Sequence, residues 1–155
     1  MIEINIARQE LIVRKEEKIL RYAISTAAKG VGQKKNSEQT PVGRHIVRAK
    51  IGAKLPLNAV LKGRRFTGEM YSAELAQQYP QRDWILTRIL WLSGCEIGWN
   101  RLGDCDSMQR YIYIHGTPDS EPMGIPRSHG CIRMRNSDVV ELFDQVSVGC
   151  EVFIK

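Results

Sequence analysis

Apolar and polar residues alternate from the second position of the chain. Three isoleucines occupy every other position of residues 2–7, which is the period of a half-buried strand. The alternation continues over residues 11–13, and the charged segment 15–18 predicts a hairpin turn before a third apolar stretch at 19–26. The N-terminal pattern therefore predicts an opening β-meander.

Strand-like patterns return in four later stretches. Residues 44–51 alternate again, and residues 84–92 are rich in apolar and aromatic side chains, as expected of a central strand. The alternation of residues 109–115 predicts a strand that ends at His115, and residues 150–154 predict a last strand. Because a strand end is a rigid platform, His115 is well placed to hold a fixed position in a site.

Two short helices are predicted between these strands. Ser72 has the hydroxyl that commonly caps a helix, and it precedes a helical segment over 73–79. Asn136 or Ser137 can cap a second helix that runs to about Val146 with its apolar side chains on one face.

Composition indicates a globular chain without repeats. The 155 residues are 43% hydrophobic and 26% charged, and we predict a single domain over residues 1–155. Segments 27–43 and 93–107 have loop composition, and residues 52–83 form an elaborated connection. No apolar run reaches membrane-spanning length, so no membrane association is expected.

The net charge of +6 favours anionic partners such as phosphorylated metabolites or polycarboxylate peptides. No nucleic-acid-binding motif accompanies this charge, so nucleic acid is not an expected partner. The N-terminal residues lack the apolar core of a secretory signal, which predicts a cytoplasmic protein. If a signal peptide has been removed from the sequence, a periplasmic location is the alternative.

The chemistry of the chain concentrates between residues 111 and 136. A thiolate is the nucleophilic form of cysteine, and a neighbouring histidine can take up the thiol proton. Here His115 and His129 flank the loop that leads to Cys131, and we expect them to raise its thiolate fraction. Zinc binding by these three residues with Cys105 is the alternative, but CxxC and HxxxH spacings are absent and we expect no metal. The four cysteines fit no disulfide framework.

These residues resemble the signature of a known family. The run Ile114-His115-Gly116-Thr117, followed by Ser128-His129-Gly130-Cys131-Ile132-Arg133-Met134, is similar to the L,D-transpeptidase (YkuD-type) catalytic domain. Thr40-Pro41-Val42-Gly43 resembles a further element of that family, so the resemblance extends over nearly the whole chain. It implies a mostly β fold, a mixed β-sandwich with two short helices.

The resemblance also implies roles for the residues around the thiol. Cys131 would be the nucleophile, His115 its base, and the backbone carbonyl of Gly116 would orient the imidazole. His129 would support the charged intermediate. The backbone N–H groups of Gly130 and Cys131 would form the oxyanion hole.

On the substrate side, Arg133 would grip a peptide carboxylate with its planar guanidinium. Ser128 belongs to the same group, where we expect it to order the loop rather than to react. Arg64, Arg65 and Tyr71 could line a groove, but the sequence does not place them.

The substrate class comes from the resemblance alone. It implies a cysteine enzyme without a cofactor that acts on the peptidoglycan tetrapeptide stem, or on a nucleotide-linked muropeptide. Water as acceptor would make it an L,D-carboxypeptidase of cytoplasmic muropeptide recycling, like the unexported members of the family. An amine acceptor would make it a cross-linking L,D-transpeptidase, and a non-catalytic muropeptide- or anion-binding module is the third possibility. The glycan or nucleotide handle, the third-position diamino acid and the oligomeric state are left open.

Overall fold

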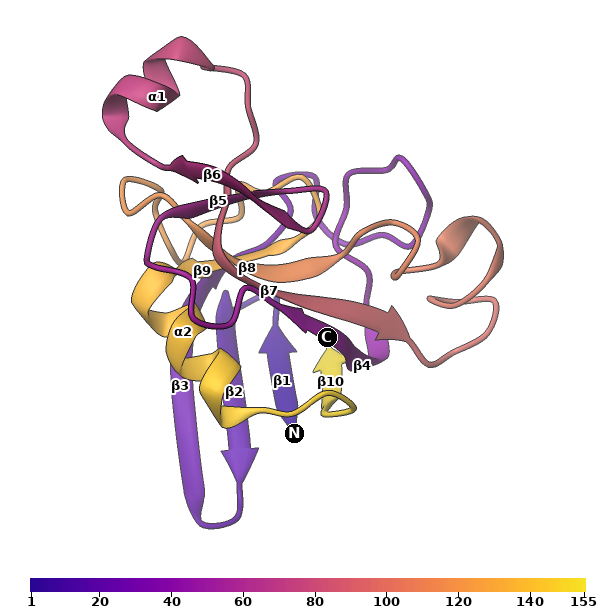
Figure 1. Ribbon diagram of the computed structural model, residues 1–155. Helices are drawn as coiled ribbons and strands as arrows, with labels where there is room; N and C mark the ends of the chain where they lie inside the picture. The colour runs from indigo at the N-terminus through magenta and orange to yellow at the C-terminus, as the bar shows by residue number, and fades with distance from the viewer.

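A computed structural model of the chain describes all residues, 1–155, and Figure 1 shows its arrangement. It contains ten strands, two α-helices and one short 3-10 helix. In chain order these are β1 (Ile2–Asn5), β2 (Glu10–Lys15), β3 (Lys18–Ser25), β4 (Gly43–Ile51), β5 (Ala59–Lys62), β6 (Arg65–Met70), α1 (Ala73–Gln78), β7 (Ile85–Gly94), η1 (Gly103–Cys105), β8 (Tyr113–Thr117), β9 (Ile132–Arg135), α2 (Asn136–Gln145) and β10 (Glu151–Ile154).

All ten strands belong to one mixed sheet that closes on itself. Their order is β4-β10-β1-β2-β3-β9-β8-β7-β5-β6, and a further pairing between β4 and β7 joins the ring. The pairs β1–β10 and β8–β9 are parallel, and the other pairs are antiparallel. The β5–β6 hairpin and α1 project from the ring at the start of β7, at the top of Figure 1. The predicted mostly β fold with two helices is confirmed, and its layers are parts of a single barrel-like sheet.

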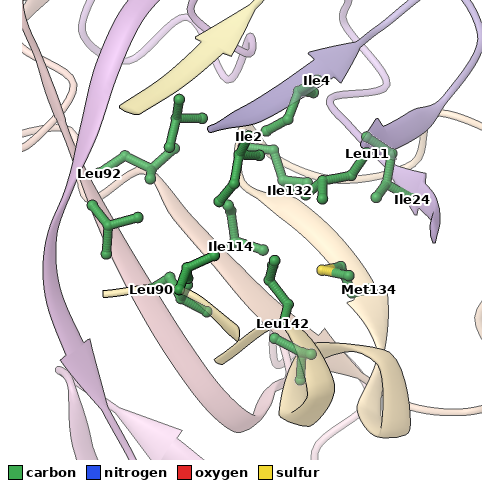
Figure 2. Packing of buried hydrophobic residues seen from close by; sticks show 14 of the residues in the cluster. Ile2, Ile4, Leu11, Ile24, Leu90, Leu92, Ile114, Ile132, Met134 and Leu142 are labelled. Carbon is green, nitrogen blue, oxygen red and sulfur yellow. The ribbon is translucent and has the colours of Figure 1, made fainter. Parts of the chain in front are cut away.

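The main core fills the inside of this sheet. Side chains from β1, β2, β3, β7, β8 and β9 converge there, and Figure 2 shows Leu142 of α2 packed beside Ile114 and Met134. The cluster contains 19 buried residues, and burying one such Leu, Ile or Met side chain is worth about 1.5–3 kcal/mol. The apolar stripe predicted for the second helix is the face that α2 buries here. Neither α-helix is long and apolar enough to cross a membrane.

The second helix starts differently from the prediction. Arg135 occupies the N-cap position, and the side chain of Asn136 turns into the protein instead of capping the helix. Its Oδ1 accepts a hydrogen bond of 2.7 Å from Thr87 Oγ1, and its Nδ2 donates to Asn58 Oδ1 at 3.0 Å. A buried polar network therefore takes the side chain that the sequence pattern assigned to the cap. The cap of α1 is as predicted, since Ser72 Oγ accepts from the N–H of Leu75.

Two other elements differ from the sequence prediction. The strand expected over 109–115 begins only at Tyr113, because Tyr111 has a left-handed backbone with φ of 57° that interrupts an extended segment. The β5–β6 hairpin and the short strand β9 were not predicted. Each has only four to six residues, so periodicity gives little signal there.

Candidate active site

The site is built on the parallel pair of β8 and β9. In their register Ile114 lies beside Ile132 and His115 lies beside Arg133. The two isoleucines point into the main core. Because successive side chains of a strand alternate between faces, His115 and Arg133 share the opposite face, and Cys131 directly precedes β9 on that same face. The parallel pairing thus places the three residues on one face of the sheet, although the loop of residues 118–131 connects the two strands.

The Cys131 thiol contacts backbone groups at the start of β8 and just before it. The N–H of Tyr113 donates to Sγ at 3.3 Å, and Sγ lies 3.2 Å from the carbonyl oxygen of Tyr111. The residue is half-buried against a small apolar cluster that includes Leu61 and Ile89. Burial raises the pKa of the Cys131 thiol to about 12, more than the Tyr113 N–H lowers it. The expected increase in thiolate fraction is therefore wrong for the resting protein, which holds a thiol.

His115 is buried in a single defined tautomer. Its Nδ1 lies 2.7 Å from the carbonyl oxygen of Gly116, which is the contact expected from the sequence. Since a carbonyl can only accept, Nδ1 carries the hydrogen and Nε2 presents a lone pair. Burial lowers the pKa of His115, and the nearby Asp83 carboxylate partly opposes this by favouring the imidazolium. At neutral pH the residue is thus a neutral imidazole that can accept a proton at Nε2.

Gly116 has no room for a side chain. A Cβ atom there would lie 2.6 Å from the carbonyl oxygen of Leu86 and would also meet Oδ1 of Asn136. A glycine at this position therefore lets β8 pass close to β7 while its carbonyl holds His115.

The loop before β9 is organised by Ser128. Its buried hydroxyl accepts from the N–H of Gly130 at 3.2 Å and donates to the carbonyl oxygen of Cys131 at 2.5 Å. Ser128 thus orders the loop, and its hydroxyl is not directed at a ligand. The Gly130 N–H is already bonded, whereas the Cys131 N–H has no partner in the structure. Of the two N–H groups expected to form the oxyanion hole, only that of Cys131 is free to donate.

His129 is exposed and lies at the edge of two hollows. The larger one, of about 320 Å³, is lined by polar and charged side chains with few apolar ones: Pro80, Gln81, Arg82, Asp83, Trp84, Thr117, Pro118, Glu121, Arg127, His129 and Arg133. The smaller one, of about 200 Å³, is lined by Lys35, Asn36, Glu38, Gln109, Arg110, Tyr111, Ile112 and His129. His129 therefore separates two places where groups could approach the loop that carries Cys131.

Arg133 is buried beside two carboxylates that sequence reasoning missed. Its Nη2 lies 3.2 Å from Asp83 Oδ1 and its Nη1 lies 3.7 Å from Glu121 Oε2. Its Nε is buried without a hydrogen-bond partner. Neither acid belongs to a motif: Asp83 is 50 residues from Arg133, and Glu121 lies in the loop that leads to β9, so no sequence pattern pointed to them.

The residues left open by the sequence take different positions. Arg64, at the turn between β5 and β6, lies 4.7 Å from the ring centre of Trp91 and 4.9 Å from that of Tyr111. It also donates to the Tyr113 hydroxyl at 3.0 Å. Arg64 therefore packs the β5–β6 hairpin against β7 and the start of β8, next to the residues that contact the Cys131 sulfur.

The other two lie farther from the thiol. Tyr71 packs edge-on against Trp84, with ring centres 5.1 Å apart, and Trp84 lines the larger hollow. The side chain of Arg65 is exposed. No group of three or more His, Cys, Asp or Glu side chains converges where a metal ion could bind.

Comparison with known proteins matches this arrangement to one family. The family model described as the YkuD L,D-transpeptidase catalytic domain matches residues 1–154. The probable L,D-transpeptidase YbiS of Escherichia coli K12 is 46% identical over 43 residues, which are 28% of this chain and 14% of YbiS. The putative L,D-transpeptidase YqjB of Bacillus subtilis 168 is 51% identical over 45 residues, which are 29% of this chain and 26% of YqjB.

Solved structures show the same fold. An L,D-transpeptidase from Mycobacterium smegmatis aligns with a TM-score of 0.61 at 18% identity, over 99% of this chain and 57% of that one. A mutant of the Enterococcus faecium L,D-transpeptidase aligns with a TM-score of 0.59 at 21% identity, over 99% of this chain and 48% of that one. The chain thus spans about half the length of these solved relatives.

Proposed function

The chain belongs to the YkuD family of L,D-transpeptidase catalytic domains, and from this premise we propose that it is a cysteine-dependent L,D-carboxypeptidase. It would remove the terminal D-Ala from peptidoglycan tetrapeptide stems through a thioester on Cys131. One observation carries the proposal. His115 and Cys131 share a face of the β8–β9 pair, and the bond from Nδ1 to the Gly116 carbonyl leaves His115 Nε2 free to accept a proton.

In the acylation step, His115 Nε2 takes the proton of the Cys131 thiol as the sulfur attacks the carbonyl carbon before D-Ala. The tetrahedral oxyanion is stabilised by the Cys131 N–H. When the intermediate collapses, the C–N bond breaks and the leaving amine of D-Ala takes the proton from His115. Because the thiol and the imidazole are both neutral at rest, charge develops only during the reaction.

In the second step, a water molecule gives its proton to His115 Nε2 and attacks the thioester carbonyl. The C–S bond breaks, the sulfur recovers the proton, and the tripeptide leaves with a free carboxylate. The Asp83 carboxylate would stabilise the imidazolium in both steps, since opposite charges attract.

The sizes of the two hollows support water as the acceptor. The larger hollow, of about 320 Å³, reaches the roughly 300–1,000 Å³ of ordinary small-molecule sites, and Arg133 in its wall could bind a stem carboxylate. The smaller hollow, of about 200 Å³, falls below that range and is small for a second peptide stem. The net charge of +6 favours anionic substrates such as nucleotide-linked muropeptides, and we assign the enzyme to their recycling in the cytoplasm.

An L,D-transpeptidase that forms cross-links is the second candidate. The observation in its favour is the smaller hollow itself, because it adjoins His129 and its wall includes the Glu38 carboxylate, which could attract an amine. In that case the amine of a second stem would attack the thioester in place of water.

The deciding experiment is mass spectrometry of a purified tetrapeptide stem incubated with the protein, with and without a diamino-acid acceptor. We expect tripeptide and free D-Ala, with little change when the acceptor is added. Cross-linked dimer as the main product would favour the transpeptidase. Cys131→Ala is the matched control, and a wild-type protein that shows no more product than this variant would favour a binding function.

A further inference from the structure

The segment Thr40-Pro41-Val42-Gly43 leads into β4 and has no part in the chemistry described so far. Thr40 is fully buried, and its Oγ1 contacts two distant backbone groups. The N–H of Ala27 donates to Oγ1 at 3.0 Å, and Oγ1 lies 2.9 Å from the carbonyl oxygen of Gly130. Because the Ala27 N–H can only donate, the hydroxyl hydrogen of Thr40 must point at the Gly130 carbonyl.

That carbonyl belongs to the same peptide unit as the Cys131 N–H. The chain has no cis peptide bond, so this unit is planar and trans, and its C=O and N–H point in opposite directions. Holding the Gly130 carbonyl therefore sets the direction of the Cys131 N–H. This N–H has no hydrogen-bond partner in the structure.

Thr40 is itself firmly anchored. Its N–H donates to the Gly30 carbonyl and its carbonyl accepts from the Gly32 N–H, each at 3.0 Å. Arg110 secures the residue before it, because Nη2 donates to the Gln39 carbonyl at 2.6 Å. A hydroxyl on such a fixed backbone can hold a flexible loop in one orientation.

We propose that Thr40 is a positioning residue for acylation, whose hydroxyl orients the Gly130–Cys131 peptide so that the Cys131 N–H meets the developing oxyanion. The inference rests on the proposed function in one respect, namely that Cys131 forms an acyl-enzyme. It does not depend on which peptide or acceptor is used. Thr40 would touch neither the substrate nor the sulfur and would act only through the peptide it holds.

The test compares two reactions of Cys131 in Thr40→Val. Acylation by p-nitrophenyl acetate passes through an oxyanion, whereas alkylation by iodoacetamide does not. Removing an oxyanion donor outright costs about 10²–10³ in rate, so we expect misdirecting it to slow acylation about 10- to 100-fold. The rate of Cys131 alkylation, measured by peptide mapping, should change less than about threefold. Thr40→Ser should restore the acylation rate because it keeps the hydroxyl.

Thr26→Val is the matched control. Its hydroxyl is equally buried, but it accepts from Gln9 Nε2 at 2.7 Å and does not contact the loop of residues 128–131. We expect a comparable loss of thermal stability with acylation at the wild-type rate.

Several outcomes would overturn the inference: equal slowing of acylation and alkylation in Thr40→Val, no slowing at all, Thr40→Ser as slow as Thr40→Val, or a wild-type protein that the ester does not acylate at Cys131. The proposed function fails separately. If no tetrapeptide is cleaved while ester acylation still depends on the Thr40 hydroxyl, the peptidase assignment is wrong and the positioning role stands.

Discussion

Arg133 Nη2 lies 3.2 Å from Asp83 Oδ1, across a separation of 50 residues in the chain. With Glu121 on its other terminal nitrogen, the guanidinium is held between two carboxylates in the wall of the larger hollow. A substrate carboxylate that binds Arg133 would therefore exchange with, or join, these acidic partners.

Replacing Arg133 tests whether it binds a substrate carboxylate. Hydrogen bonds to charged groups are worth about 1.5–3 kcal/mol, so Arg133→Lys should lower kcat/KM about 10- to 100-fold, because a lysine cannot present two parallel donors. The loss should be smaller for a stem whose terminal carboxylate is amidated. Steady-state kinetics on the free and amidated peptides provides the comparison, and equal losses on both would assign Arg133 a structural role.

Asp83 should control the acid side of the pH–rate profile. Its carboxylate raises the pKa of His115 against the lowering effect of burial, so Asp83→Asn should lower that pKa further. Because the base must be unprotonated, the acid limb of kcat/KM should move to lower pH. Glu121→Gln is the matched control, since Glu121 also pairs with Arg133 but is not among the groups that shift His115. An acid limb that moves equally in both variants would contradict this role for Asp83.

Local patterns predicted much of this chain. Strands β1 to β3 and helix α1 with its Ser72 cap follow from periodicity and capping, because these signals lie within a few residues of one another. The contact from His115 to the Gly116 carbonyl was expected from the family resemblance.

The rest depends on contacts between distant segments. The pairing of β4 with β7 that closes the sheet and the placement of Asp83 beside Arg133 leave no local trace in sequence. The Thr40 segment was recognised only as a resemblance, and its contact with Gly130 spans 90 residues. The raised pKa of Cys131 comes from burial, which cannot be read from the neighbouring histidines.

The reactivity of Cys131 should reflect its buried thiol. With its pKa raised to about 12, only a small fraction is thiolate near neutral pH. Alkylation by iodoacetamide should therefore be slower at Cys131 than at the exposed Cys95 at pH 7, and its rate should still be rising at pH 9. Peptide mapping of labelled protein at several pH values measures both. A rate at Cys131 that is already constant below pH 7 would indicate a thiolate–imidazolium pair instead.

Acid should destabilise the fold through its buried histidines, and His45 offers the cleaner test because it lies outside the site. Its Nδ1 is 3.0 Å from the Gly43 carbonyl and its Nε2 is 2.8 Å from Ser107 Oγ, so the neutral ring donates on one side and accepts on the other. Burial lowers the pKa of His45 below its ordinary value of 6.5, as it does for His115.

The unfolded state therefore binds more protons than the folded state just below pH 6.5. In that window the free energy of unfolding decreases as the pH is lowered. Each such histidine contributes a slope of up to about 1.4 kcal/mol per pH unit. His45→Asn keeps a donor for the Gly43 carbonyl but leaves Ser107 without its acceptor, and should cost about 1–3 kcal/mol at pH 7. Urea unfolding at pH 7, 6 and 5 should show that the variant loses less stability in acid than the wild type does. The free energies of unfolding of the two proteins should therefore converge at low pH. Parallel curves would mean that His45 does not contribute to the acid sensitivity.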